Sequence, residues 1–208
     1  MRFTIITVSY NSENTIEKTI QSVLAQTYQD LEYLVIDGAS TDHTIDIVKE
    51  YEPRFQGRLR FVSEPDNGIY DAMNKGIRMA TGDIIGIVNS DDWLEPDALQ
   101  IVDGCYKEHG NNENCLCCGW LNFQYNDGTV QVLKTSHELL LSMSSRYEMA
   151  GIRHPATFVP KAVYDRWGIF DESIKIMADT DLILRFLFNG VEFIYPDRVL
   201  SNMSDGGV

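Results

Sequence analysis

The chain has 208 residues, of which 44% are hydrophobic and 11% aromatic, as in globular proteins large enough to bury one core. Its 17 basic and 31 acidic side chains give a formal net charge of −14, and the basic residues are scattered. This charge argues against a nucleic-acid partner, because phosphate backbones would be repelled. An acidic chain that binds a phosphorylated ligand needs a divalent cation to neutralise it.

No run reaches the length of a transmembrane helix, and the first residues resemble a strand rather than a signal peptide. We therefore expect a cytoplasmic protein. The four cysteines, Cys105, Cys115, Cys117 and Cys118, lack the paired C-x-x-C spacing of a zinc site, and adjacent cysteines are poor disulfide candidates. Reduced, partly buried thiols are expected.

The first half of the chain alternates short apolar runs with amphipathic segments, which predicts parallel βαβ units. A first helix follows Ser12, with Asn14 and Glu17 spaced as a capping box and an apolar stripe that starts at Ile16. The expected strands are 3–9, 34–36, 59–62 and 84–88, and the other expected helices are 42–51, 69–80 and 96–110.

The alternation breaks down after residue 110. Segments 115–125 and 129–133 flank Asn126-Asp127-Gly128, which predicts a β-hairpin. A helix at 137–144, a strand at 154–159, a helix at 179–189 and a strand at 192–195 are expected to follow. We interpret residues 1–208 as one domain, with a nucleotide-binding half at about 1–110 and a more mixed half at about 111–208.

Two adjacent carboxylates, Asp91 and Asp92, come directly after the hydrophobic run 84–88. Such a pair loses hydration and repels itself unless a cation or a polar ligand offsets the cost. Ligands of open α/β sheets bind at this end of the strands. The pair therefore indicates a metal and phosphate site, although turn residues before a helix at Pro96 would show the same pattern.

Two other predicted strands also end in carboxylates. Asp37 is followed by Gly38, which would let a flat ligand approach the backbone, so Asp37 is a candidate contact for a nucleobase or ribose. A role as a turn and helix-cap residue explains Asp37 equally well. Asp66 and Asn67 lie at a strand-to-helix crossing on the same edge, where a substrate contact is plausible.

Asp179 is the unusual carboxylate of the second half. At about 100° per residue, a helix that begins near 179 places Asp179 on its apolar side and Asp181 on the opposite side, four residues before Arg185. We expect a solvated Asp181–Arg185 ion pair and a partly buried Asp179 that accepts a proton, with helix N-capping as the alternative for Asp179. His154 is either structural or an acceptor-side residue.

Taken in order, seven blocks of this sequence resemble the inverting family 2 glycosyltransferases of the GT-A fold. Each block alone is a weak signal, but all of them in this order are specific, and they cover nearly the whole chain. They are Thr7–Asn11, Gln21–Tyr28, Val35–Asp42, Glu64–Gly76, Asn89–Leu94, His154–Phe158 and Ala178–Leu182.

The resemblance implies an α/β fold of the GT-A type, a Rossmann-like fold of nucleotide-diphospho-sugar transferases with a mixed, mainly parallel sheet flanked by helices. It implies a nucleotide-sugar donor, usually UDP-linked, and a Mn²⁺ or Mg²⁺ ion. The acceptors of such enzymes are often lipid-linked saccharides of bacterial surface polysaccharides, which implies peripheral membrane contact at the inner face of the plasma membrane.

The resemblance also implies roles for individual residues. Thr7, Val8 and Tyr10 would line the nucleotide pocket, Asp37 would hold the base, and Asp66 would lie close to the nucleotide together with Asn67. In the D-x-D-type motif, Asp91 would contact ribose or the donor sugar, and Asp92 would bind the metal. The Glu-Asp motif of the family falls on Ala178-Asp179, which makes Asp179 the catalytic base and leaves its usual supporting carboxylate absent. His154 would lie on the acceptor side.

Two alternatives remain open. A nucleotidyltransferase has a related sheet, but its early Gly-rich, basic phosphate loop has no counterpart in residues 9–14. A non-catalytic nucleotide-sugar-binding module is the other, and the sequence favours it in one respect. Relatives often continue beyond a Gly-Gly-Val-Ser-like element into further helices, whereas this chain stops at Gly206-Gly207-Val208, so a truncated C-terminus is expected.

Overall fold

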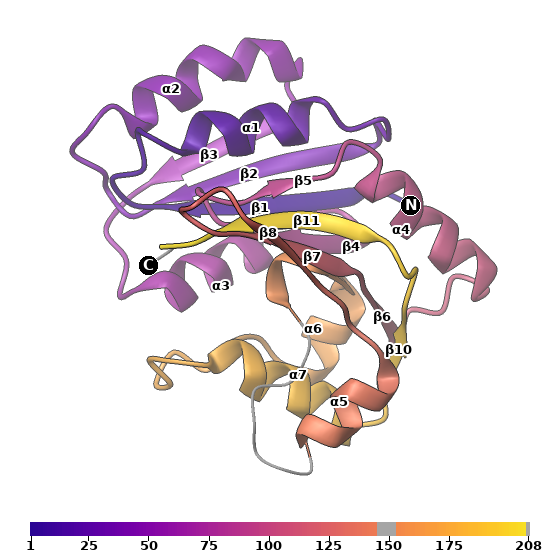
Figure 1. Ribbon diagram of the computed structural model, residues 1–208. Helices are drawn as coiled ribbons and strands as arrows, with labels where there is room; N and C mark the ends of the chain where they lie inside the picture. Colours follow the sequence, from indigo (N-terminus) through magenta and orange to yellow (C-terminus); the bar gives the residue numbers. More distant parts are fainter. Residues whose placement is uncertain (145–152, 207–208) are drawn as a thin grey trace.

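The computed structural model describes residues 1–144 and 153–206. These residues form a seven-stranded sheet and a four-stranded sheet, with helices on both faces of the larger one (Figure 1). The strands are β1 (Phe3–Ser9), β2 (Leu31–Asp37), β3 (Leu59–Ser63), β4 (Ile84–Ile87), β5 (Trp93–Leu94), β6 (Cys115–Cys118), β7 (Trp120–Gln124), β8 (Val130–Leu133), β9 (Thr157–Pro160), β10 (Glu192–Ile194) and β11 (Val199–Ser204). The helices are α1 (Ile16–Leu24), α2 (Thr44–Tyr51), α3 (Ile69–Met79), α4 (Ala98–Glu108), α5 (His137–Ser144), α6 (Lys161–Trp167) and α7 (Ala178–Phe188), with short 3₁₀ turns η1 (Glu52–Phe55) and η2 (His154–Ala156).

The larger sheet has the order β10-β6-β9-β4-β1-β2-β3. Strand β9 is antiparallel to both of its neighbours, and all other neighbouring pairs are parallel. This confirms the mixed, mainly parallel sheet. The smaller sheet has the order β5-β11-β7-β8 and contains the predicted hairpin, β7 paired with β8.

Alternating side chains of the central strand β1 divide the core into two halves. Phe3 and Ile5 pack with helices α1, α2 and α4 on one face, whereas Ile6 and Val8 pack with α3, α6 and α7 on the other. Period-two alternation along a strand forces this division. The parallel strands β1 to β4 end on the side of the molecule where α3 begins and where the C-terminus lies (Figure 1).

Several local predictions need correction. The capping box is wrong, because α1 begins at Ile16 after Thr15, and no side chain caps it. Glu17 instead accepts a hydrogen bond from the Tyr51 hydroxyl at 2.6 Å, which ties α1 to α2. The expected strand 154–159 begins as a 3₁₀ turn and becomes extended only at Thr157.

The segment 115–125 is not one strand. It divides at Gly119 into β6 and β7, which belong to different sheets. Strands β5 and β11 and helix α6 were not predicted. All four cysteines are free and buried, Cys105 on α4 and the others on β6. Among the described residues, the helices are all too short or too polar to cross a bilayer.

Gly119 is required where the chain passes from one sheet to the other. A Cβ atom at this position would lie 2.3 Å from Cγ of Leu200, a buried residue of β11. We predict that Gly119→Ala lowers the free energy of unfolding by about 1–3 kcal/mol, because the overpacked core must shift.

The control for that variant is Gly104→Ala, since a Cβ atom at Gly104 of α4 meets no atom within 4 Å. This control should raise stability by about 0.5–1 kcal/mol through helix propensity. Urea unfolding of both variants tests the pair, and equal effects at the two glycines would contradict the assignment of Gly119 to a tight sheet junction.

Candidate active site

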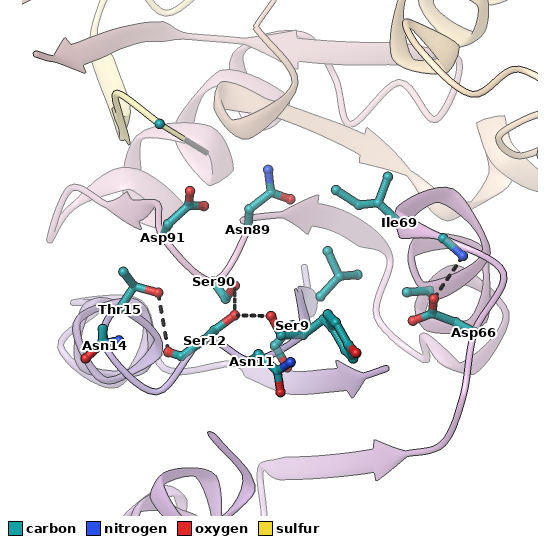
Figure 2. Close-up of a pocket in the computed structure, with 15 residues that line it drawn as sticks. Ser9, Asn11, Ser12, Asn14, Thr15, Asp66, Ile69, Asn89, Ser90 and Asp91 are labelled. Carbon is teal, nitrogen blue, oxygen red and sulfur yellow. Dashed lines mark hydrogen bonds between the residues drawn. The ribbon is translucent and has the colours of Figure 1, made fainter. Parts of the chain in front are cut away.

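A pocket of about 440 Å³ lies at the carboxyl ends of β1 and β4, beside the first turn of α3 (Figure 2). Its lining comes from three segments of the first half and one residue near the C-terminus. The lining residues are Val8, Ser9, Tyr10, Asn11, Ser12, Asn14, Thr15, Asp66, Gly68, Ile69, Ala72, Asn89, Ser90, Asp91 and Gly206. The position agrees with the rule that open α/β sheets bind ligands at this edge.

The two adjacent carboxylates have different environments. Asp91 lines the pocket, whereas the side chain of Asp92 is only 1% exposed and does not. Burial, followed by the charge of Asp91, raises the pKa of Asp92 to about 8. Burial also raises the pKa of Asp91. Loss of hydration thus disfavours the charged form of both carboxyl groups, as expected from their place at the end of a buried strand.

Strand β11 closes over this pair. The Ser204 backbone N–H donates to Asp92 Oδ1 at 3.3 Å, and the Ser204 hydroxyl donates to the Asp91 carbonyl oxygen at 2.5 Å. The Asp92 carbonyl oxygen in turn accepts from the Thr19 hydroxyl at 2.6 Å. Helix α1 and strand β11 therefore hold the turn at residues 89–92 from two sides.

The donor set at this turn suits a divalent cation that also binds a diphosphate. Asp92 Oδ2 is buried and has no hydrogen-bond partner, and none of the described lining residues of the pocket is Lys or Arg. Within residues 1–144 and 153–206, no three or more His, Cys, Asp or Glu side chains are grouped to hold an ion. A cation here would take its other ligands from phosphate and water, which is how Mg²⁺ is usually held.

Asp37 is fully buried and bonded on both oxygens. Its Oδ1 accepts from the Ser9 hydroxyl at 3.1 Å and from the Ser40 hydroxyl, and its Oδ2 accepts from the Ser40 N–H at 2.9 Å and the Ser63 hydroxyl at 2.7 Å. These contacts match the turn role considered from the sequence. A nucleobase contact stays a prediction, and it requires one serine hydroxyl to give way.

Gly38 makes room for neighbouring side chains of the protein. A Cβ atom there would lie 2.6 Å from Asp66 Oδ2 and 3.4 Å from Tyr10 Cδ2. The approach of a flat ligand to this backbone stays a prediction, and the finding brings Tyr10, Gly38 and Asp66 together at one edge, as the strand ends predicted.

The expected pocket residues in β1 and directly after it do not all face the pocket. Val8 and Tyr10 line the pocket, and Tyr10 is 64% exposed. Thr7 does not line it: its side chain is fully buried and accepts a hydrogen bond from the Tyr33 hydroxyl at 3.0 Å. Strand alternation turns Thr7 to the opposite face of the sheet from Val8.

Asn67 is also absent from the lining, although its neighbours Asp66 and Gly68 belong to it. Its backbone N–H donates to Asp71 Oδ2 at 2.9 Å, and the Gly68 N–H donates to Asp66 Oδ1 at 2.9 Å. The structure therefore gives Asn67 a contact that shapes the entry to α3, and its substrate contact stays a prediction.

Asp179 and His154 lie near each other, outside the pocket. Burial lowers the pKa of His154, and the negative charge of Asp179 acts in the opposite direction. Burial and the same charge raise the pKa of Tyr70. Asp179 is partly buried in the first turn of α7, where its Oδ1 accepts a hydrogen bond from the Thr180 N–H at 2.8 Å. The N-cap position itself belongs to Met177, so Asp179 serves the helix end from within the first turn, and its role as a base stays a prediction.

The predicted Asp181–Arg185 ion pair is present at 2.6 Å, with Asp181 42% exposed. It is more than a solvated pair, because Arg185 Nη1 also donates to the carbonyl oxygens of Trp167 and Ile169 at 3.2 and 2.9 Å. Arg185 thereby ties α7 to the end of α6.

Comparison with known proteins decides the family. The model of the family described as Glycosyl transferase family 2 matches residues 4–166, which is most of the chain. The chain belongs to glycosyl transferase family 2.

Curated relatives of this family 2 chain include a chondroitin synthase of Escherichia coli, 29% identical over 196 residues that cover 92% of this chain and 28% of the relative. Another is a PGL/p-HBAD biosynthesis glycosyltransferase of Mycobacterium tuberculosis, 28% identical over 90% of this chain and 70% of the relative. The chain thus spans less than a third of the length of the chondroitin synthase.

Solved structures confirm the expected GT-A fold. S. aureus TarS 1–349 in complex with UDP-GlcNAc is similar with a TM-score of 0.78 and 20% identity, over 100% of this chain and 60% of that one. A mannosyltransferase from Pyrobaculum calidifontis in complex with GDP-Man and Mn²⁺ is similar with a TM-score of 0.72 and 20% identity, over 98% of this chain and 56% of that one.

The sequence did not predict that Ser204, Gly206 and Tyr70 contact the candidate site or the helix of Asp179. Ser204 and Gly206 reach it through β11, a strand whose polar sequence Ser201-Asn202-Met203-Ser204 gives little strand signal. Tyr70 belongs to the block Glu64–Gly76, but its partner Ala178 lies far along the chain, so no local pattern indicates the contact.

The raised pKa of Asp92 predicts how stability depends on pH. Between the ordinary value of 3.8 and about 8, the folded protein retains a proton that the unfolded chain has released. Stability should therefore fall as pH rises through this window. Asp92→Asn should remove much of this dependence, as measured by urea unfolding between pH 5 and 8.5 with EDTA present.

Glu50→Gln, which alters an exposed carboxylate of α2, is the control and should keep the wild-type slope. A wild-type slope in Asp92→Asn would contradict the buried, neutral carboxyl group.

Proposed function

We propose that this chain is the catalytic part of an inverting glycosyltransferase that transfers a sugar from a nucleotide-sugar donor, UDP-linked, to a hydroxyl group of a saccharide or lipid-linked saccharide. The observation that carries the proposal is the acidic pocket at the carboxyl ends of β1 and β4, with Asp66 and Asp91 in its lining. Family membership supports the reaction class, and the saccharide acceptor is supported by relatives named chondroitin synthase and hyaluronan synthase.

The pocket offers contacts for both the base and the sugars of a nucleotide-sugar donor. Tyr10 presents an exposed ring at the pocket edge, against which a nucleobase can stack. Asp91 faces the cavity and can accept hydrogen bonds from ribose or sugar hydroxyls. Residues 1–110 would therefore hold the donor, and residues 111–208 would supply the acceptor side through His154 and Asp179.

Asp92, with its unpartnered buried oxygen, would hold Mn²⁺ or Mg²⁺. When bound, such an ion supplies Lewis-acid stabilisation of the charge that develops on the diphosphate leaving group. The absence of Lys and Arg from the described pocket lining supports a role of this kind for a cation.

Asp179 would deprotonate the acceptor hydroxyl, which attacks the anomeric carbon on the face opposite the diphosphate and so inverts its configuration. Its carboxylate lies in the first turn of α7 beside His154 and Tyr70, where it is partly shielded from solvent. General-base assistance is worth roughly 10²–10⁴-fold in rate.

We predict that Asp179→Asn lowers transfer by roughly 10²–10⁴-fold and leaves UDP binding unchanged, because the amide cannot accept the proton. The measurements are UDP release in the presence of acceptor and UDP titration by calorimetry. Asp181→Asn is the matched control two residues along the same helix, and it should retain transfer within about 2-fold since it loses only a partly exposed ion pair. Near wild-type turnover in Asp179→Asn would refute the base.

The proposed metal site at Asp92 is tested by UDP binding. We predict that UDP binding measured by calorimetry requires Mn²⁺ or Mg²⁺ and weakens at least about 10-fold in Asp92→Ala, because the phosphates then face uncompensated carboxylates. UDP binding of equal strength without metal would contradict Asp92 as a ligand.

The enzymatic class is tested by measuring turnover of a panel of UDP- and GDP-sugars with saccharide acceptors, which identifies the donor sugar. Metal-dependent binding without any turnover would favour a non-catalytic binding module.

A further inference from the structure

Helix α7, which carries Asp179, has no side-chain cap at its N-cap position. The first N–H groups of a helix have no partner within the helix. Met177 occupies the N-cap position with φ of 68° and makes no side-chain cap hydrogen bond. Within the first turn, Asp179 Oδ1 accepts a hydrogen bond from the Thr180 N–H at 2.8 Å, which leaves the Ala178 N–H to find another partner. Ala178 has no polar side chain either, although the family resemblance places a glutamate there.

The partner of this helix end comes from α3. The Ala178 N–H donates to the Tyr70 hydroxyl at 3.2 Å, across 108 residues of sequence. Tyr70 is the second residue of α3, directly after Ile69, which lines the pocket. Adjacent residues of α3 therefore contact the donor pocket and the start of α7.

Tyr70 is itself held rigidly. Its ring stacks on Phe170, with centroids 5.4 Å apart and planes inclined by 22°. The fully buried Asn74, one helical turn later on α3, bonds the Phe170 backbone in both directions: its Nδ2 donates to Phe170 O at 2.9 Å, and its Oδ1 accepts from Phe170 N–H at 3.0 Å. Residues four apart share one helix face, so Tyr70 and Asn74 together clamp the segment that leads into α7.

The same cluster reaches the acceptor-side histidine. The His154 ring meets the Phe170 ring edge-on, with centroids 5.7 Å apart. Tyr70 and His154 thus contact the same aromatic ring, and the charge of Asp179 acts on both of them.

We propose that Tyr70 is a positioning residue, whose hydroxyl holds the first turn of α7 and thereby sets the place of Asp179 relative to the donor pocket. It takes over, from another helix, the support that a glutamate at position 178 would give. This inference rests on the proposed role of Asp179 as the base.

The test uses Tyr70→Phe, which keeps the ring that stacks on Phe170 and removes only the hydroxyl. We expect kcat for transfer to fall about 10- to 100-fold, because small displacements of a catalytic group cost that much, with KM for the donor and the melting temperature nearly unchanged. Amide exchange at Ala178 should accelerate about 5-fold, the effect of losing one hydrogen bond. Tyr125→Phe, which removes a hydroxyl bonded to Gln131 on the β7–β8 hairpin, is the control and should keep wild-type kcat.

A double-mutant cycle separates positioning from a general structural role. If Tyr70 acts through Asp179, Tyr70→Phe should have no further effect on the residual rate of Asp179→Asn, whereas equal losses in both backgrounds would overturn the proposal. Wild-type kcat in Tyr70→Phe, with Asp179→Asn inactive, would overturn this inference alone. Wild-type turnover in Asp179→Asn would overturn the proposed base and this inference with it.

Discussion

The contact between β11 and the turn after β4 is the constraint on which both the site and the second sheet depend. Ser204 bonds to Asp91 and Asp92 from a strand that pairs with β5 and β7, so the smaller sheet ends over the carboxylate pair. Holding Asp92 there costs free energy, because its buried carboxyl group has one oxygen without a partner. Apolar packing of Leu94, Leu121 and Leu200 offsets that cost. The result is a buried carboxyl group that a cation can stabilise.

Helix α3 connects the two chemical parts of the proposed enzyme. Its first turn contributes Ile69 to the pocket, and the next residue, Tyr70, contacts the helix of Asp179. The buried Asn74 fixes the intervening segment through Phe170. A transfer reaction needs the acceptor base and the donor carbon at a defined separation, and a rigid helix with partners at both sites provides this more accurately than a loop.

The acidic character of the chain has a local counterpart in the site. Asp66 and Asp91 face the cavity without a basic residue among its described lining, so the proposed diphosphate would need a cation for charge compensation. The net charge of −14 is therefore compatible with the proposed phosphorylated donor, provided that the proposed cation binds with it.

The sequence by itself determined the βαβ half of the fold and the edge at which its carboxylates meet, because buried parallel strands and amphipathic helices are encoded by local periodicity, and such strands end on one side. Only the tertiary structure decided which face Thr7 takes, where β6 passes into β7, and what supports Asp179. The alternation of apolar residues is the same for a strand in either sheet, so it does not mark the division at Gly119, where a Cβ atom would overlap Leu200 of the other strand. The Tyr70–Ala178 bond joins residues 108 positions apart, and no local pattern encodes a partner at that distance.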